Sequence, residues 1–168
     1  MRCLLVYSSV TGNTRAVAEA IREAMPEGAV MRSVQKAPSP DEFACIILGF
    51  WVHRAGPDPL MARYMQRVRG KKTAFFGTLA AYPDSEHAQK VIARAEELLE
   101  GNVIAGSFLC QGGLSEKRLA ERLAGDGDAR HPMTEERRAR LLEAARHPDK
   151  RDFAQARDAF RAWLAQWI

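Results

Sequence analysis

The chain has 168 residues, of which 46% are hydrophobic and 27% charged. This is the size and composition of one globular domain, so we expect a single domain over residues 1–168 and exclude a disordered chain. The formal net charge is +4, but basic residues alternate with acidic ones and accompany no nucleic-acid-binding motif, so we expect no nucleic-acid partner.

Short apolar runs alternate with segments that have a helical period. In chain order, the sequence predicts a strand at 2–7, a helix at 13–25, a weaker strand at 29–34, a strand at 44–50, a helix at 60–68, a strand at 73–78, a helix at 84–99 and a strand at 102–110. The run at 44–50 is apolar on both faces, which is typical of a central strand in a parallel sheet. Strands that alternate with helices predict right-handed crossovers and a doubly wound α/β fold.

Residues 114–151 separate the fifth strand from a final helix that begins near Asp152. A doubly wound five-stranded sheet needs only one helix after its last strand, so we interpret residues 114–151 as an inserted helical segment. Within it we expect one amphipathic helix, a turn at residues 125–128 and a second helix capped by Thr134. The insert is a candidate specificity element, in the form of a lid or a partner surface. Its many charges indicate either an exposed helix face or a docking face for an acidic partner.

A hydroxyl-rich segment follows the first strand and leads directly into the first helix. A helix start offers unpaired N–H groups and the positive end of a dipole, and serine and threonine hydroxyls add further donors, so this segment predicts a phosphate site. It has neither the lysine of the G-x-x-x-x-G-K-[ST] loop nor the G-x-G-x-x-G pattern. The residues of this candidate phosphate loop are Ser8, Ser9, Val10, Thr11, Gly12, Asn13 and Thr14.

This loop resembles the S/T-x-T-G-N-T phosphate loop of flavodoxins. Residues 11–14 match it identically and Ser9 fills the leading hydroxyl position. The resemblance spans residues 1–113 and resumes in the last helix. It implies a three-layer fold with five parallel strands in the order 2-1-3-4-5, FMN as the cofactor with its 5′-phosphate in the loop, and electron transfer between redox partner proteins.

Two further loops should converge on the phosphate loop, because ligands of open α/β sheets bind beyond the carboxyl ends of the strands, where the strand order reverses. These loops are residues 49–57 and 77–84. The resemblance implies that they flank the isoalloxazine ring, with Trp51 and Tyr82 as stacking candidates, although either aromatic could instead pack on the sheet. From these loops and the end of the fifth strand, the expected cofactor-binding residues are Phe50, Trp51, Val52, His53, Arg54, Thr78, Leu79, Ala80, Tyr82, Gln111 and Gly112.

Three functions remain open at this point, and we favour an electron carrier without catalytic residues of its own. Flavodoxins that replace ferredoxin are usually acidic, whereas this chain is basic and carries His53 and Arg54 in its second loop. These two residues and the insert also fit a small FMN oxidoreductase of the NAD(P)H:quinone or protoporphyrinogen type. The basic surface also fits an accessory module that assists a partner reductase.

Export and membrane insertion are not expected. No apolar run approaches the ~20 residues of a membrane-spanning helix, and the first residues lack the hydrophobic region of a secretory signal. Cys3, Cys45 and Cys110 are widely separated, which fits packed thiols that stay reduced in a cytoplasm. The four histidines are scattered along the sequence, and we expect no metal site.

Overall fold

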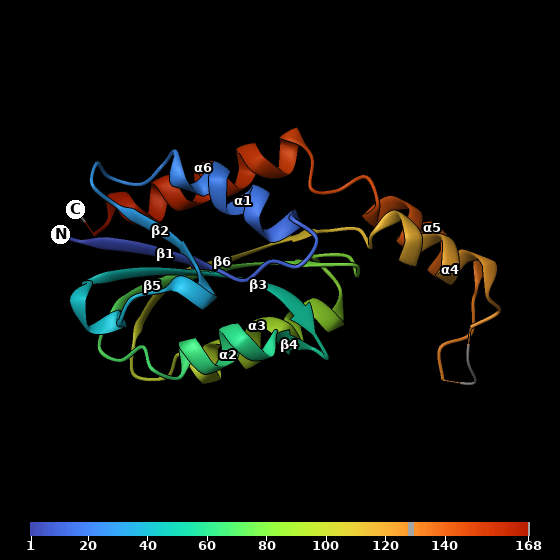
Figure 1. Ribbon diagram of the computed structural model, residues 1–168, viewed down its shortest axis with the longest axis horizontal. Coiled ribbons are helices and arrows are strands. Elements are labelled where there is room, and N and C mark those ends of the chain that lie inside the picture. The colour runs from blue at the N-terminus through green and yellow to red at the C-terminus, as the bar shows by residue number, and fades with distance from the viewer. Residues whose placement is uncertain (128–129, 168) are drawn as a thin grey trace.

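The computed structural model describes residues 1–127 and 130–167. Helices cover both faces of one sheet, which gives three layers (Figure 1). The described strands are β1 (Cys3–Tyr7), β2 (Val30–Ser33), β3 (Cys45–His53), β4 (Gly56–Pro57), β5 (Lys72–Leu79) and β6 (Val103–Gln111). Five of them run parallel in the order β2-β1-β3-β5-β6, with the short β4 antiparallel to β3. The doubly wound sheet and the strand order implied by the flavodoxin resemblance are confirmed.

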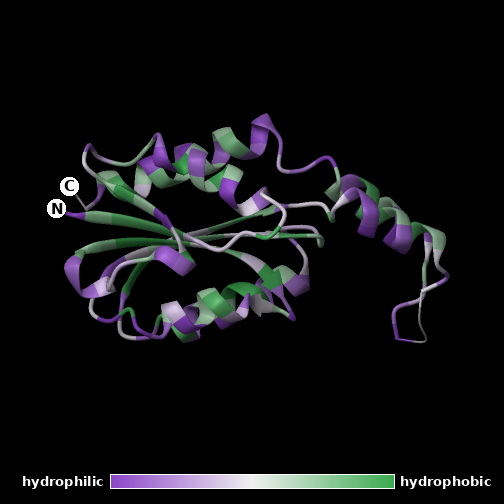
Figure 2. Cartoon of the chain, viewed as in Figure 1, coloured by the Kyte–Doolittle hydropathy of each residue, from purple (hydrophilic) through white to green (hydrophobic). Residues whose placement is uncertain are grey.

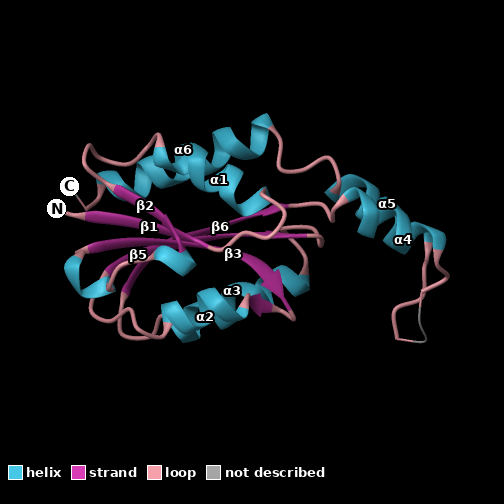
Figure 3. Ribbon diagram, in the orientation of Figure 1, coloured by secondary structure: helices cyan, strands magenta, loops and turns pink. Residues whose placement is uncertain are grey.

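The helices are divided between the two faces of the sheet. Figure 3 shows α1 and α6 on one face and α2 and α3 on the other. The described helices are α1 (Asn13–Arg22), α2 (Pro59–Met65), α3 (Glu86–Leu98), α4 (Glu116–Ala124), α5 (Glu135–Ala144) and α6 (Lys150–Ala165), with single 3₁₀ turns η1 (Val34–Lys36) and η2 (Pro40–Glu42). No helix in residues 1–127 or 130–167 is long and apolar enough to cross a membrane.

The central strands are buried on both faces, as the apolar run at 44–50 predicted. Successive residues of β3 point to opposite sides, so Ile47 packs in the core beneath α1 and α6 while Ile46 and Leu48 pack in the core above α2 and α3. In Figure 2 the strands are accordingly hydrophobic along most of their length. This burial fixes the position of the carboxyl ends of β1, β3 and β5, which lie at one edge of the sheet.

The second predicted loop was wrong in part, because β3 continues beyond Gly49 as far as His53. Trp51 pairs with Thr78 of β5, and the strand then reverses into β4. Arg54 and Ala55 form the two-residue turn, with φ values of 48° and 58°. A turn with two left-handed residues matches the twist of a hairpin. Such a turn usually contains asparagine or glycine, and Arg54-Ala55 contains neither, so the sequence pattern does not indicate it.

The insert forms two helices, α4 and α5, that extend beyond the carboxyl ends of the strands (Figure 1). Thr134 caps α5 as expected, since its hydroxyl oxygen accepts a hydrogen bond from the backbone N–H of Arg137 at 3.1 Å. Arg138 of α5 donates to the carbonyl oxygen of Leu123 in α4 at 3.0 Å, which joins the two helices. Of the turn predicted at 125–128, residue 128 lies outside the described residues, and Gly127 forms an isolated bridge with Pro132.

Candidate cofactor site

The phosphate loop connects the end of β1 to the start of α1. The backbone N–H of Ser8 still bonds to the carbonyl oxygen of Gly49 at 2.8 Å, and the chain leaves the sheet after that residue. Gly12 stands at the helix start with φ 94°, in the left-handed region that favours glycine. Gly12, at the capping position, has no side chain with which to cap α1, and Ser9 of the loop accepts the backbone N–H of Arg15 in the first turn at 3.3 Å. The N–H groups of Asn13 and Thr14 and the positive end of the helix dipole are left for an anion or water.

The other α-helices that the structure describes have capped amino termini. In each of them a side-chain oxygen accepts a hydrogen bond from a backbone N–H of the first turn, as is usual for serine, threonine and aspartate caps. These capping residues are Asp58, Ser85, Ser115, Thr134 and Asp149. The start of α1 differs from those of the other helices because its capping residue is a glycine, and it lies at the carboxyl ends of the strands, where a ligand of this fold is expected.

A pocket of about 790 Å³ opens at this edge. Its volume is in the range of small-molecule sites, and its wall combines apolar side chains with a few polar groups. The lining residues are Val10, Thr11, Asn13, Thr14, Trp51, Val52, Thr78, Leu79, Ala80, Gly112, Gly113, Leu114, Ser115 and Arg118. The pocket is therefore formed by the phosphate loop, the end of β3, the end of β5 and the first part of the insert.

Hydrogen bonds join the phosphate loop to the neighbouring segments of the pocket. The hydroxyls of Thr14 and Thr78 lie 2.8 Å apart, which links α1 to β5. The side-chain amide of Asn13 donates to the carbonyl oxygen of Gly113 at 2.9 Å, which links α1 to the start of the insert. Ser9 accepts a bond from the backbone N–H of Arg15 at 3.3 Å, so its own hydroxyl hydrogen remains available to a ligand.

Asp58 is a buried carboxylate directly behind the loop. Only 1% of the residue is exposed, and Oδ1 accepts bonds from the Ser8 hydroxyl at 2.8 Å and from the backbone N–H of Met61 at 3.2 Å. Its own N–H donates to the carbonyl oxygen of Trp51 at 3.0 Å, so this one residue contacts both the phosphate loop and the Trp51 strand. Burial raises the pKa of the Asp58 carboxyl, and the bonds from Ser8 and Met61 oppose that rise only in part.

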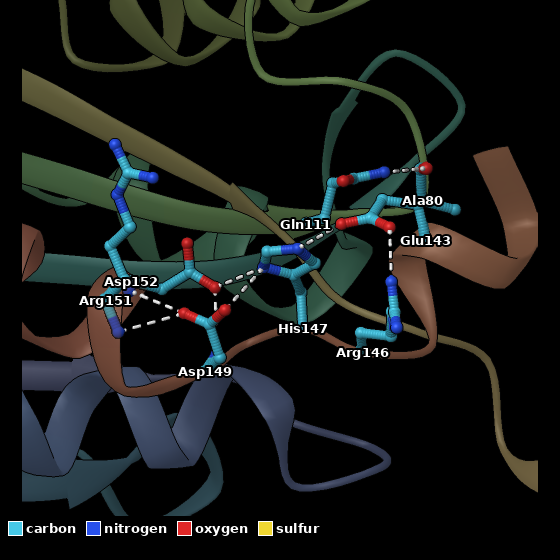
Figure 4. Close-up of polar contacts among 8 residues, drawn as sticks. All are labelled: Ala80, Gln111, Glu143, Arg146, His147, Asp149, Arg151 and Asp152. Atoms are coloured by element: carbon cyan, nitrogen blue, oxygen red, sulfur yellow. Dashed lines mark hydrogen bonds and ion pairs between the residues drawn. The ribbon is translucent and has the colours of Figure 1, made fainter.

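His147 anchors the base of the insert (Figure 4). Its Nδ1 lies 2.6 Å from the carboxylate of Asp152 and its Nε2 lies 3.0 Å from that of Glu143. The bond to Asp152, together with that to Glu143, raises the pKa of His147 although partial burial opposes the charge. The carbonyl oxygen of His147 accepts the N–H of Gly113 at 3.2 Å, so this network holds the segment that borders the pocket.

Residues 4–161 match the flavodoxin domain family. The chain belongs to this family. It is 27% identical over 164 residues to the flavodoxin-like domain-containing protein BilS of Clostridioides difficile (strain CD3), with 93% of this chain and 92% of that protein covered.

Solved flavodoxin structures share the fold. Oxidised flavodoxin 2 from Bacillus cereus superposes with a TM-score of 0.60 at 17% identity, covering 99% of each chain. A flavoprotein in complex with FMN from Lactobacillus acidophilus NCFM gives a TM-score of 0.51 at 14% identity, covering 74% of this chain and 99% of that one.

In this flavodoxin domain, the pocket wall brings together part of the set that the sequence predicted. From the phosphate loop it holds Val10, Thr11, Asn13 and Thr14, from β3 Trp51 and Val52, from β5 and the residue after it Thr78, Leu79 and Ala80, and beyond β6 Gly112.

The remaining predicted residues have other surroundings. Phe50 is fully buried and stacks on Phe75 in the core, with ring centroids 6.0 Å apart. Gln111 is buried and donates to the carbonyl oxygen of Ala80 at 3.2 Å. The other predicted residues that do not line the pocket are Ser8, Ser9, Gly12, His53, Arg54 and Tyr82.

The sequence analysis proposed the insert as a specificity element but named none of its residues for the site. Leu114, Ser115 and Arg118 of the insert line the pocket, together with the preceding Gly113. Asp58 was missed as well. Its position before Pro59 is a signal for a helix cap, but nothing in the sequence shows that the carboxylate is buried beneath the loop.

Replacing Asp58 with asparagine should change how stability depends on pH. Because the folded-state pKa of Asp58 is raised above its ordinary value of 3.8, its stabilising contribution is fully present below that value and is lost as pH rises through the folded-state pKa. Asparagine keeps the cap and does not titrate. Urea unfolding at pH 4 and pH 7 should therefore show that D58N gains stability relative to the wild type at the higher pH. D84N, at an exposed carboxyl, is the control, and an equal pH response of D58N and the wild type would contradict the prediction.

Proposed function

We propose that this flavodoxin domain binds FMN and carries electrons between redox partner proteins in the cytoplasm. The observation that carries the proposal is the start of α1, where Gly12 offers no side-chain cap and the T-G-N-T residues open into a pocket beside Trp51. The FMN complex of the Lactobacillus acidophilus flavoprotein supports the choice of cofactor. The three cysteines are free and buried, which supports a reducing compartment.

The donors of the phosphate loop fit a phosphate monoester. The N–H groups at the start of α1 offer neutral hydrogen bonds, and the hydroxyls of Ser9 and Thr11 add two more donors. The left-handed Gly12 has no atom within 4 Å of the position where a Cβ would stand, so the loop is open on that side. These residues would hold the phosphate, and the Asn13 amide would keep the insert beside it through Gly113.

The pocket walls fit a flat ring. Trp51 is half-buried on the wall and meets His53 edge to face, with ring centroids 5.5 Å apart. Backbone groups of residues 78–80 lie on the same wall and could bond to the ring edge. Bound FMN would supply the electron transfer itself, while the protein supplies binding, shielding from water and electrostatics. Tyr82 stays a predicted stacking partner, two residues beyond the pocket-lining Ala80 and 41% exposed.

A small FMN oxidoreductase is the second candidate, because one observation favours it. The pocket extends from the phosphate loop to Leu114, Ser115 and Arg118 of the insert, which gives a substrate a wall that a minimal five-stranded flavodoxin would lack.

Loading with FMN is the first test. Absorbance from 300 to 700 nm, before and after adding FMN, should show flavin bands with quenched fluorescence. Thr11→Ala should weaken FMN binding by about 1–3 kcal/mol, because it removes a hydroxyl donor to a charged phosphate. Its affinity for riboflavin, which has no phosphate, should remain that of the wild type. A spectrum that added FMN leaves flat would reject the proposed cofactor and would favour the accessory module.

Carrier and enzyme are then separated by kinetics. Photoreduced holoprotein should pass electrons to an acceptor protein with an acidic docking face, and the rate should fall as salt is added because this chain has a net charge of +4. Steady-state assays with NAD(P)H and quinones should show no turnover. Sustained quinone reduction would reject the carrier in favour of the oxidoreductase.

Trp51→Ala should raise the potential of the second reduction step of bound FMN. The electron-rich face of an aromatic ring disfavours the negatively charged reduced flavin, and its removal also admits water to the ring. Trp51→Phe, which keeps an aromatic face, is the matched control and should shift the potential less. Spectroelectrochemical titration measures both variants, and an unmoved potential in the alanine variant would remove Trp51 from the stacking role.

A further inference from the structure

We propose that Arg118, supplied by the insert, is a further phosphate-binding residue of this site and makes the pocket selective for FMN over unphosphorylated flavin. The proposal rests on the FMN function proposed above. The phosphate loop itself offers a phosphate dianion only neutral hydrogen-bond donors. Arg118 would add a positive charge from outside that loop.

The loop itself leaves the charge of the phosphate uncompensated. A phosphate monoester carries about −1.5 to −2 charges at neutral pH. Residues 8–14 contain no lysine or arginine, and the next residue, Arg15, directs its guanidinium to Glu19 at 3.0 Å. The cation nearest in sequence is therefore already paired along the exposed side of α1.

The start of α4 lies next to the start of α1. Asn13 donates to the carbonyl oxygen of Gly113, and the chain then passes through Leu114 to Ser115, the cap of α4. Ser115 accepts the backbone N–H of Arg118 at 3.4 Å, so Arg118 stands in the first turn of that helix. Arg118 lines the same pocket as Thr11 and Asn13. Arg118 is far from the phosphate loop in the sequence, yet both line the same pocket.

The guanidinium of Arg118 is available for an anion. Its side chain makes no hydrogen bond or ion pair with any residue in the described parts of the chain, whereas Arg138 bonds to Leu123 and Arg146 to Glu143. Arginine presents a planar set of donors that matches two phosphate oxygens at once. The site would thereby combine the neutral donors of α1 with one full positive charge.

Hydrogen bonds hold Gly113, the residue before the insert, in place beside the phosphate loop. The N–H of Gly113 bonds to the carbonyl oxygen of His147, whose ring lies between Glu143 and Asp152 (Figure 4). Gly113 therefore has hydrogen bonds on both sides, one to the phosphate loop and one to the loop before α6. On this account the insert completes the phosphate site, and its outer helix faces remain free for partners.

The test compares FMN with riboflavin. Dissociation constants are measured by quenching of flavin fluorescence at low salt for the wild type, R118Q, R118K and R122Q. Arg122 is one turn further along α4, is also exposed, and does not line the pocket, which makes it the matched control. R118Q should bind FMN about tenfold more weakly and riboflavin as the wild type does. R118K should recover part of the loss, R122Q should match the wild type, and added salt should weaken FMN binding less in R118Q than in the wild type.

Two results would overturn the inference alone. Wild-type FMN affinity in R118Q would show that Arg118 does not reach the phosphate. An equal loss of FMN and riboflavin would place it against another part of the flavin. A wild-type protein that binds neither flavin would instead overturn the proposed function, and this inference with it. Circular dichroism of R118Q should match the wild type, because the side chain is exposed.

Discussion

The amino terminus of α1 has backbone N–H groups that its capping residue, Gly12, cannot satisfy, and the other residues of the site are arranged around this helix start. Unpaired backbone donors in a concave site must be satisfied by water or by an anion. Elsewhere a serine, threonine or aspartate provides the cap, as Ser115 does for α4. At α1 the equivalent position is Gly12, whose left-handed φ turns the chain without supplying an acceptor. A ligand that brings its own oxygens is the natural occupant of such a helix start.

Three polar contacts hold this helix start against its neighbours. The hydroxyl pair of Thr14 and Thr78 joins it to the central strands, Asn13 joins it to the insert, and Ser8 joins it to the buried Asp58. Each contact connects segments far apart in the sequence. Asp58 has a double role, because it also caps the helix that follows the Trp51 hairpin. Asp58 therefore connects the phosphate loop, through Ser8, with the strand that carries the proposed stacking residue Trp51. Burial raises the pKa of this carboxyl and so favours its protonated form.

The insert changes the character of the site relative to a minimal five-stranded sheet. Its first residues form part of the pocket wall, and the preceding Gly113 bonds to the carbonyl oxygen of His147, whose ring contacts Glu143 of α5 and Asp152 of α6. The same segment carries many exposed charged residues, and α4 and α5 are coloured largely hydrophilic in Figure 2. In our proposals the insert therefore has two roles, because Arg118 binds the cofactor and the exposed charges of α4 and α5 contact a partner protein.

The sequence by itself determined the fold class and the position of the phosphate loop, because both depend on local information. The apolar run at 44–50 indicates a strand buried on both faces, and the hydroxyl-rich segment 8–14, which contains the T-G-N-T residues, follows the first strand directly. The strand order came from resemblance, since periodicity cannot rank the strands. Only the tertiary structure decided that Trp51 lies in a strand, that Asp58 is buried behind the loop, and that Arg118 lines the pocket. Each depends on a contact between segments distant in the sequence, and no spacing pattern within one segment records such a contact.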